Sequence, residues 1–370
     1  MLSVRYDDRI FTMQRRGGIS RYFVELITEF RNDPSLGVTP QIGWRWTNNA
    51  HAVEARLGTP LRVPGSSRGG IVRMANRATQ LGRRAPDLAH DTYYRPGYPS
   101  GRGAPPLAVT IYDMTPELFP ELFPEGNPHA NKRAYVERAA LVLCISESTR
   151  RDLLLLYGAI AAPTVVTHLG VGSQFAPGAP RPAWAPGRYV LFLGVRTAHK
   201  DFGVALEAFS RLAPDYPGTT LLAVGAGPFT ADESALIDRW GLGGRVVQHA
   251  ATDAELPGVF GAAVAFVFPS RYEGFGLPTL EAMACGTPAV LADSSSNPEV
   301  GGSAALYFPP GDPAALAMQL GRLLADEAFR AERSALGLAQ AGRFTWRRTA
   351  EATADAYRLV VGAGSRPPVR

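Results

Sequence analysis

The sequence contains little cysteine and no group of histidines and cysteines at metal-site spacing. Cys144 and Cys285 are its only cysteines, which is too few for the disulfide framework of a small secreted domain. No secretory signal is recognisable at the amino end, so we expect a cytoplasmic protein with two free thiols. An Asp-x-Asp pair is also missing. We therefore expect no bound metal.

Long apolar runs are missing too. The longest, around residues 259–268, is well short of the ~20 residues that a membrane-spanning helix needs. A hydrophobic content of 46% with 19% charged residues describes a soluble globular protein, neither disordered nor fibrous. The length of 370 residues predicts two domains of ordinary size.

Lysine is rare, since Lys132 and Lys200 are the only two in an arginine-rich chain. The net charge is +6 over residues 1–170 and −1 over residues 171–370. A basic first half favours an anionic membrane surface or an anionic acceptor, although an arginine-rich composition alone gives the same charge. Zinc-finger spacing, RNP-like aromatic motifs and dense basic runs are missing, so nucleic acid is not an expected partner.

Predicted strands and helices alternate along the chain, which is typical of α/β folds with parallel sheets. The segment 175–188 holds four prolines and few apolar side chains, and it predicts an extended connector between two domains, 1–174 and 189–346. Apolar runs predict strands at residues 2–6, 87–94, 107–113, 141–145, 189–194, 220–225, 246–249 and 264–268.

The stretch 268–288 is the most informative about function. A buried strand is followed by Glu273-Gly274-Phe275-Gly276, and Pro278 suits the first turn of a helix. Free backbone amides at such a turn bind an anion or sugar hydroxyls. Glu273 lies in the loop and Glu281 in the helix, so the two carboxylates can contact two ends of one extended ligand.

Two other turns have groups suited to phosphate. Arg196 and Lys200 share a short strand-to-helix loop, where a forked guanidinium and a point charge suit a diphosphate. Gly17 and Gly18 open an amphipathic helix, and glycines there let backbone amides approach a phosphate closely. The run Gly225-Ala226-Gly227-Pro228 lacks the third glycine of a dinucleotide fingerprint, so it does not indicate NAD.

The run from Glu273 to Pro288 resembles the Glu-x7-Glu signature of glycosyltransferase family 4, retaining enzymes with the GT-B fold. The amino end, 6–11 followed by 17–22, resembles that of a bacterial subgroup of this family. The resemblance covers nearly the whole chain and weakens mainly between about Thr47 and Arg84. It implies two Rossmann-like doubly wound parallel-sheet domains facing a central cleft, with a helix at about 347–361 packing back on the first domain.

The resemblance also implies roles for individual residues. Glu281 would hold the nucleotide ribose, and Glu273 with neighbouring amides would hold the donor sugar. Glu273, Lys200 and Arg196 are the implied catalytic residues. The implied donor-binding set is Gly17, Gly18, Arg196, Lys200, Glu273, Gly274, Phe275, Gly276, Leu277 and Glu281.

Tyr112 and Asp113 stand where many family members have His-Asp. Because tyrosine replaces the histidine, the role of that histidine is not carried over. Two interpretations stay open for Asp113: with Tyr112 it lines the sugar or acceptor pocket, or it caps the turn that follows.

The resemblance implies a cytoplasmic, metal-independent, retaining glycosyltransferase whose donor is a nucleotide-diphosphate sugar and which needs no further cofactor. GDP-mannose is the first choice of donor, and the acceptor is a glycan or lipid-linked glycan in surface-polysaccharide or lipopolysaccharide assembly. The alternatives are a UDP- or dTDP-sugar donor, or a non-catalytic nucleotide-sugar-binding protein. The basic segment 68–84 predicts either a helix on the inner face of the cell membrane or an ordinary helix with solvated arginines.

Overall fold

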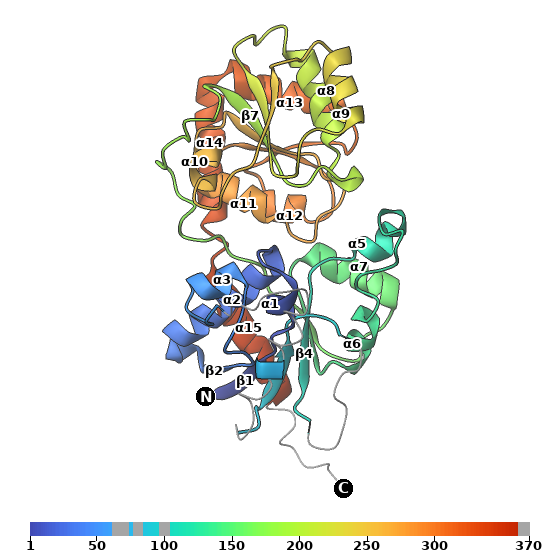
Figure 1. Cartoon of the computed structure of the whole chain (residues 1–370), viewed down its shortest axis with the longest axis vertical. Coiled ribbons are helices and arrows are strands. Elements are labelled where there is room, and N and C mark those ends of the chain that lie inside the picture. The colour runs from blue at the N-terminus through green and yellow to red at the C-terminus, as the bar shows by residue number, and fades with distance from the viewer. Residues whose placement is uncertain (61–73, 77–83, 96–103, 362–370) are drawn as a thin grey trace. The chain divides into compact units, whose positions relative to one another are not determined.

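The structure is a computed structural model that describes residues 1–60, 74–76, 84–95 and 104–361. Most of the basic segment 68–84 lies outside the described residues. The chain forms two compact units (Figure 1). Unit 1 comprises Met1–Leu169 and Trp346–Arg370, and unit 2 comprises Gly170–Thr345.

Each unit is built around a six-stranded parallel sheet, as predicted. The order is β2-β1-β3-β4-β5-β6 in unit 1 and β12-β11-β10-β7-β8-β9 in unit 2. Unit 1 contains β1 (Leu2–Tyr6), β2 (Val38–Ile42), β3 (Leu88–Asp91), β4 (Leu107–Ile111), β5 (Leu141–Cys144) and β6 (Thr164–Val166). Unit 2 contains β7 (Tyr189–Leu193), β8 (Thr220–Val224), β9 (Val246–His249), β10 (Ala265–Phe268), β11 (Ala289–Ala292) and β12 (Leu306–Phe308).

Helices connect the parallel strands, because a parallel pair needs a crossover connection. Unit 1 has α1 (Arg9–Met13), α2 (Gly18–Asn32), α3 (Ala50–Glu54), α5 (Thr115–Leu118), α6 (Lys132–Arg138), α7 (Glu147–Tyr157) and α15 (Trp346–Val361). Unit 2 has α8 (Phe202–Leu212), α9 (Ala231–Arg239), α10 (Leu256–Gly261), α11 (Leu277–Ala284), α12 (Asn297–Gly301), α13 (Pro313–Ala325) and α14 (Glu327–Ala341). None of the described helices is both long and apolar enough to cross a membrane.

The sheet of unit 2 is buried on both faces. Along β7, Val190 and Phe192 face a core shared with α8 and α13, while Tyr189 and Leu191 face a core shared with α10 and α11. Strands buried on both sides read as continuous apolar runs, which is why they stand out in the sequence. Cys144 in unit 1 and Cys285 in unit 2 are buried free thiols, as predicted.

The proline-rich segment 175–188 packs against the sheet and helices of unit 2. Phe175 and Ala185 are buried in its core, and the ring of Trp184 stacks on His249 with the ring centroids 3.8 Å apart. The segment contains turns and neither helix nor strand, and it lies within unit 2, whose first residue is Gly170.

The last helix, α15, joins unit 1 through a buried polar contact. The Tyr357 hydroxyl lies 2.6 Å from His90 Nδ1 and 3.0 Å from the Tyr6 hydroxyl, and Thr110 Oγ1 lies 2.8 Å from His90 Nε2. Burial lowers the pKa of His90 to about 3, so the ring is neutral at pH 7. Both of its nitrogens are hydrogen-bonded, and α15 is thereby fixed to β3 and β1.

We expect Tyr357→Phe to lower the stability of unit 1 by about 1–3 kcal/mol, because it leaves buried polar atoms of His90 and Tyr6 without this partner. Hydrogen exchange of the α15 amides measures the effect. Tyr216→Phe is the control, since this hydroxyl makes only a 3.4 Å contact to a backbone oxygen in unit 2. Equal protection of α15 in both variants would contradict the anchoring role.

Candidate functional site

The candidate site is the loop between β10 and α11. Gly276, the residue before α11, has φ +98°, a left-handed conformation that glycine adopts without strain. Pro278 lies in the first turn of the helix, as predicted. Glu273 is in the loop, whereas Glu281 is in the helix and only 5% exposed. The two carboxylates therefore belong to different elements.

Lys200 and Glu273 form an ion pair between Nζ and Oε1. Lys200 ends a short 3-10 turn after β7, and Glu273 follows β10. Because β7 and β10 are parallel neighbours, the loops after their carboxyl ends meet at one edge of the sheet. The side chains are only 17% and 12% exposed, and Lys200 Nζ also lies 5.4 Å from the Phe268 ring centroid. The structure thus brings two predicted catalytic residues into direct contact.

Serines that follow β11 brace the Glu273 loop. The Glu273 N–H donates to Ser295 Oγ at 2.9 Å. The Ser296 hydroxyl lies within hydrogen-bond distance of the Glu273 and Phe275 carbonyls, at 3.0 and 2.9 Å. Sequence reasoning gave these serines no role; the available signal was a run of three hydroxyl residues just after a strand next to β10.

Three buried polar atoms near this loop have no hydrogen-bond partner among the described residues: Ser270 Oγ, Thr279 Oγ1 and Asn297 Oδ1. Their residues are fully buried. An ideal Cβ on Gly276 would lie 3.6 Å from Asn297 Oδ1 and 3.7 Å from Thr279 Oγ1, so two of these atoms surround the glycine. Unpaired buried polar atoms are few in native proteins, and each needs an explanation. At this loop they are available to a ligand or to water.

Left-handed backbone at non-glycine residues also gathers here. Of the four such residues in the described chain, Asp201, Ala226 and Ser295 belong to the loops around the candidate site. Asp201 accepts from Arg271 Nε at 2.7 Å, and Ser295 accepts from Glu273. Conformations of this kind cost about 1–3 kcal/mol and concentrate at functional sites.

Arg196 makes its hydrogen bonds with residues that follow β8. Its guanidinium donates to Glu233 and to the backbone oxygens of Gly227 and Pro228, each at 2.8 Å. It also lies 4.9 Å from the Phe229 ring centroid, and only 4% of its side chain is exposed. To bind a diphosphate, Arg196 must give up some of these contacts, so its catalytic role stays a prediction.

Gly17 and Gly18 lie at the start of α2 in unit 1. An ideal Cβ on Gly17 would lie 2.3 Å from Gln14 Oε1, so the glycine makes room for this side chain. Gln14 Oε1 in turn accepts from the Ser20 N–H at 3.4 Å. An amide oxygen therefore occupies the helix end at which we predicted a phosphate, and the phosphate-binding role of Gly17 and Gly18 stays a prediction.

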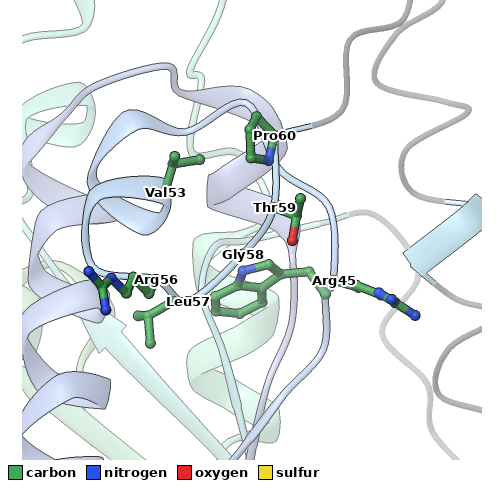
Figure 2. A pocket seen from close by; sticks show the side chains of 8 residues that line it. Arg45, Val53, Arg56, Leu57, Gly58, Thr59 and Pro60 are labelled. Atoms are coloured by element: carbon green, nitrogen blue, oxygen red, sulfur yellow. The ribbon is translucent and has the colours of Figure 1, made fainter.

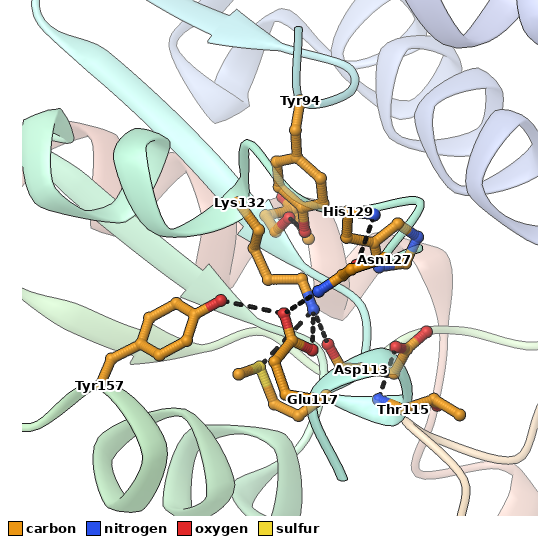
Figure 3. Close-up of polar contacts among 10 residues, drawn as sticks. Tyr94, Asp113, Thr115, Glu117, Asn127, His129, Lys132 and Tyr157 are labelled. Carbon is orange, nitrogen blue, oxygen red and sulfur yellow. Dashed lines mark hydrogen bonds and ion pairs between the residues drawn. The ribbon is translucent and has the colours of Figure 1, made fainter. Parts of the chain in front are cut away.

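Tyr112 and Asp113 follow β4. Tyr112 is buried, its hydroxyl donates to the Thr92 carbonyl at 3.3 Å, and burial raises its pKa well above the ordinary value. Asp113 Oδ1 accepts from the Thr115 N–H at 3.0 Å, so its carboxylate caps α5. Its carbonyl accepts from Lys132 Nζ at 2.8 Å (Figure 3). The capping interpretation of Asp113 is thus observed, and a role in a sugar or acceptor pocket stays a prediction.

A buried carboxylate at the end of β3 was not singled out from the sequence. Asp91 is 2% exposed, and burial together with the charge of Asp7 raises its pKa to about 7. Arg95 lies 3.6 Å away and the Tyr135 hydroxyl donates to it at 3.1 Å. Among the described residues, no group of three or more His, Cys, Asp and Glu is arranged to hold a metal ion.

Comparison with known proteins follows the same division of the chain. The sequence profile described as "Glycosyltransferase Family 4" matches residues 16–175, and "Glycosyl transferases group 1" matches residues 183–338. The chain belongs to glycosyltransferase family 4.

The chain is similar to other glycosyltransferases in sequence and to solved structures in fold. It is 33% identical over 242 residues to O-antigen chain mannosyltransferase B of Escherichia coli, and this match spans 61% of the chain and 62% of the relative. Sucrose-phosphate synthase of Thermosynechococcus elongatus has a TM-score of 0.73 at 21% identity, covering 98% of this chain and 100% of that one. Anabaena HepE, solved with UDP and glucose, has a TM-score of 0.70 at 19% identity, covering 96% and 99%. The fold is therefore GT-B.

We expect Ser296→Ala to weaken donor binding by about tenfold, the equivalent of 1.4 kcal/mol, because the Glu273 and Phe275 carbonyls lose a shared donor. The KM for the donor measures this effect. Ser303→Ala, in the same unit and outside the loop, is the matched control. A donor KM equal to that of the wild type would show that Ser296 does not position the loop.

Proposed function

We propose that this protein transfers mannose from GDP-mannose to a glycan or lipid-linked glycan acceptor in surface-polysaccharide or lipopolysaccharide assembly. The observation that carries the proposal is the contact of Lys200 with Glu273. Glu281 lies in α11, the helix that follows the Glu273 loop. Together these residues supply a cation for a diphosphate and carboxylates for sugar and ribose hydroxyls at one turn. Mannose as the sugar is supported by the similarity to O-antigen chain mannosyltransferase B.

The proposed reaction exchanges one bond at the sugar C1. The bond from C1 to the diphosphate oxygen breaks, and the acceptor oxygen bonds to C1 on the same face. Negative charge grows on the leaving diphosphate, where Lys200 and the amino end of α11 stabilise it. The acceptor proton passes to the departing phosphate oxygen, so no protein base is needed, and the configuration is retained because the acceptor bonds on the face that the diphosphate leaves. Metal ions are not needed, because positive side chains and helix amides supply the charge.

The donor can be identified by incubating purified protein with GDP-mannose, a UDP-sugar or a dTDP-sugar. Release of nucleoside diphosphate is measured for each donor, with and without EDTA. We expect release from GDP-mannose in both conditions. Proton NMR of the first product then gives the anomeric configuration, which should match that of the donor. Turnover of a UDP-sugar instead would show that the donor is a UDP-sugar and not GDP-mannose. The HepE complex with UDP supports this alternative donor. Binding without turnover of any donor would indicate a non-catalytic nucleotide-sugar-binding protein.

A further inference from the structure

A cavity of about 790 Å³ lies in unit 1, between the loop after β2 and the chain that follows α3. Volumes of this size accommodate small-molecule ligands. Trp44 and Leu57 are buried in its wall, and Val53 is half-buried. The lining residues are Trp44, Arg45, Val53, Arg56, Leu57, Gly58, Thr59 and Pro60 (Figure 2). We call it the Arg45–Arg56 cavity.

Three side chains of this cavity have N–H groups without a hydrogen-bond partner among the described residues, although the Arg45 guanidinium also lies 5.3 Å from the Trp46 ring centroid. Arg45 and Arg56 are exposed and have no ion pair in the described part of the chain, while the nearby Glu54 is bound by Arg16. Trp44 Nε1 is buried and has no hydrogen-bond partner among the described residues. Apart from the Thr59 hydroxyl, the side chains therefore offer only N–H groups. A complementary ligand must bring acceptors, and negative charge suits the two guanidiniums best.

Arg56 occupies a backbone position where arginine is unusual. Its φ of +55° is left-handed, and it follows the last turn of α3. The Leu57 N–H donates to the Ala52 carbonyl at 2.8 Å and the Arg56 N–H to the Val53 carbonyl at 3.1 Å, which is the Schellman pattern. Glycine is the usual residue at this place, and arginine there costs about 1 kcal/mol or more. A strained arginine beside a cavity points to a function of its side chain.

The cavity wall is held by contacts made elsewhere in unit 1. The buried Asn76 side chain accepts from the N–H groups of Arg45 and Trp46, at 2.9 and 3.0 Å. Phe11 stacks against Trp44 with ring centroids 4.2 Å apart. The Thr59 N–H donates to the Arg45 carbonyl at 2.8 Å, joining the two sides. The site is therefore formed before a ligand arrives, which lowers the entropic cost of binding.

We propose that the Arg45–Arg56 cavity binds an anion-bearing part of the glycan acceptor, such as a phosphate or carboxylate on a sugar chain. Figure 2 shows the Arg45 and Arg56 side chains on opposite sides of the other labelled residues, with their guanidiniums directed away from each other, so a ligand that reaches both is longer than a single phosphate. The start of α3, the helix that contributes Val53 to the wall, is joined to the chain before the Gly17 turn, because Asn49 Nδ2 donates to the Gln14 carbonyl at 2.8 Å. Assigning the ligand as acceptor rests on the proposed function, whereas the anion site itself does not.

The Trp44 indole N–H provides a direct probe of this site. The sequence has five tryptophans, so ¹⁵N-tryptophan labelling of the full chain gives a small set of indole signals, and Trp44→Phe identifies the relevant one. Inorganic pyrophosphate and D-glucuronate are the two anions to titrate. Saturation by pyrophosphate alone would indicate the diphosphate of a lipid-linked acceptor, and saturation by glucuronate alone would indicate a carboxylated glycan. Either result supports the anion site.

Arg56→Asn removes the guanidinium but retains a residue that tolerates left-handed backbone, so the fold should persist. We expect it to raise the Kd of the responding anion at least tenfold. Arg138→Gln, an exposed arginine of α6 without an ion pair among the described residues, is the matched control and should leave the Kd unchanged. A Trp44 signal unmoved by both anions at about 10 mM, ten times a Kd of 1 mM, overturns the proposal. So does an unchanged Kd in Arg56→Asn.

The same titration separates this proposal from the proposed function. A saturable Trp44 shift in a protein that turns over no donor supports the anion site and contradicts the mannosyltransferase proposal. Turnover of GDP-mannose with an unmoved Trp44 signal supports the mannosyltransferase proposal and contradicts the anion site.

Discussion

Lys200→Ala is expected to lower the turnover number by about 10²–10³, which is 3–4 kcal/mol of transition-state stabilisation. The lysine is the charged group closest to Glu273, and its side chain is only 17% exposed. In a partly buried loop, its charge is weakly screened by water. Initial rates of purified protein at saturating donor and acceptor measure the loss.

Stability has to be separated from catalysis in this variant. Lys200→Ala leaves the largely buried Glu273 without its cation and should lower the stability by about 1–3 kcal/mol, so its rates are measured well below its own melting temperature. Arg211→Ala is the matched control, because it removes one charge from an exposed pair with Glu207 on α8. Its turnover should equal that of the wild type. Near-wild-type turnover of Lys200→Ala with the true substrates would contradict its assignment as a charge stabiliser.

The double variant Lys200→Ala/Glu273→Gln tests whether the two residues act as a unit. Contacting residues usually deviate from additivity by 0.5–3 kcal/mol. We expect the second substitution to cost much less in the Lys200→Ala background than in the wild type, because the pair has already been broken. Strict additivity of the two losses would show that their contact has no role in catalysis.

The fold could be predicted from its buried strands and capped helices. The strands at 2–6 and 246–249 were expected with the bounds that the structure gives. The strands β2, β6, β11 and β12 were not predicted; β2, β6 and β12 lie at sheet edges, whereas β11 lies between β10 and β12. Edge strands pack on fewer neighbours and hold fewer apolar residues; β2 even contains Pro40, which edges tolerate.

The site could be predicted in part. The residues 273–281 form a strand-to-helix turn because glycine and proline fix its backbone, and this signal is local. The contact of Lys200 with Glu273 depends on the strand order β11-β10-β7, which no spacing along the chain specifies. For the same reason the sequence did not indicate that Arg196 would bind Glu233. Contacts between residues far apart in the sequence depend on the order of the strands, whereas a turn depends on the glycine and proline residues within it.

Lys132, the other lysine of the chain, is fully buried in unit 1 and lies outside the loop between β10 and α11. Its Nζ donates to Glu117 Oε2 and to the Asp113 carbonyl, both at 2.8 Å. Glu117 also accepts from the Tyr157 hydroxyl at 2.9 Å and from Asn127 Nδ2 at 3.3 Å (Figure 3). The network ties the beginning of α6 to the loop after β4.

We expect Lys132→Met to destabilise unit 1 by about 3–5 kcal/mol at pH 7, because it leaves the Glu117 carboxylate half-buried without its cation. Hydrogen exchange of the β4 and β5 amides measures the free energy of opening. Arg133→Met is the matched control: it is the next residue of the same helix, and its pair with Glu137 is exposed. The control should cost less than about 1 kcal/mol. Equal losses in the two variants would contradict the network.

The pH dependence sharpens this test. Burial alone raises the pKa of Glu117, but hydrogen bonds from Lys132, Tyr157 and Asn127 outweigh it, and the net pKa lies below the ordinary 4.5. In the wild type this stabilisation is present above pH 4.5 and is lost as the pH falls through the lowered pKa. In Lys132→Met burial is less opposed and the Glu117 pKa rises, so protonation relieves the penalty. The difference between the two proteins should therefore shrink on acidification, and Glu117→Gln in the Lys132→Met background should remove that pH dependence.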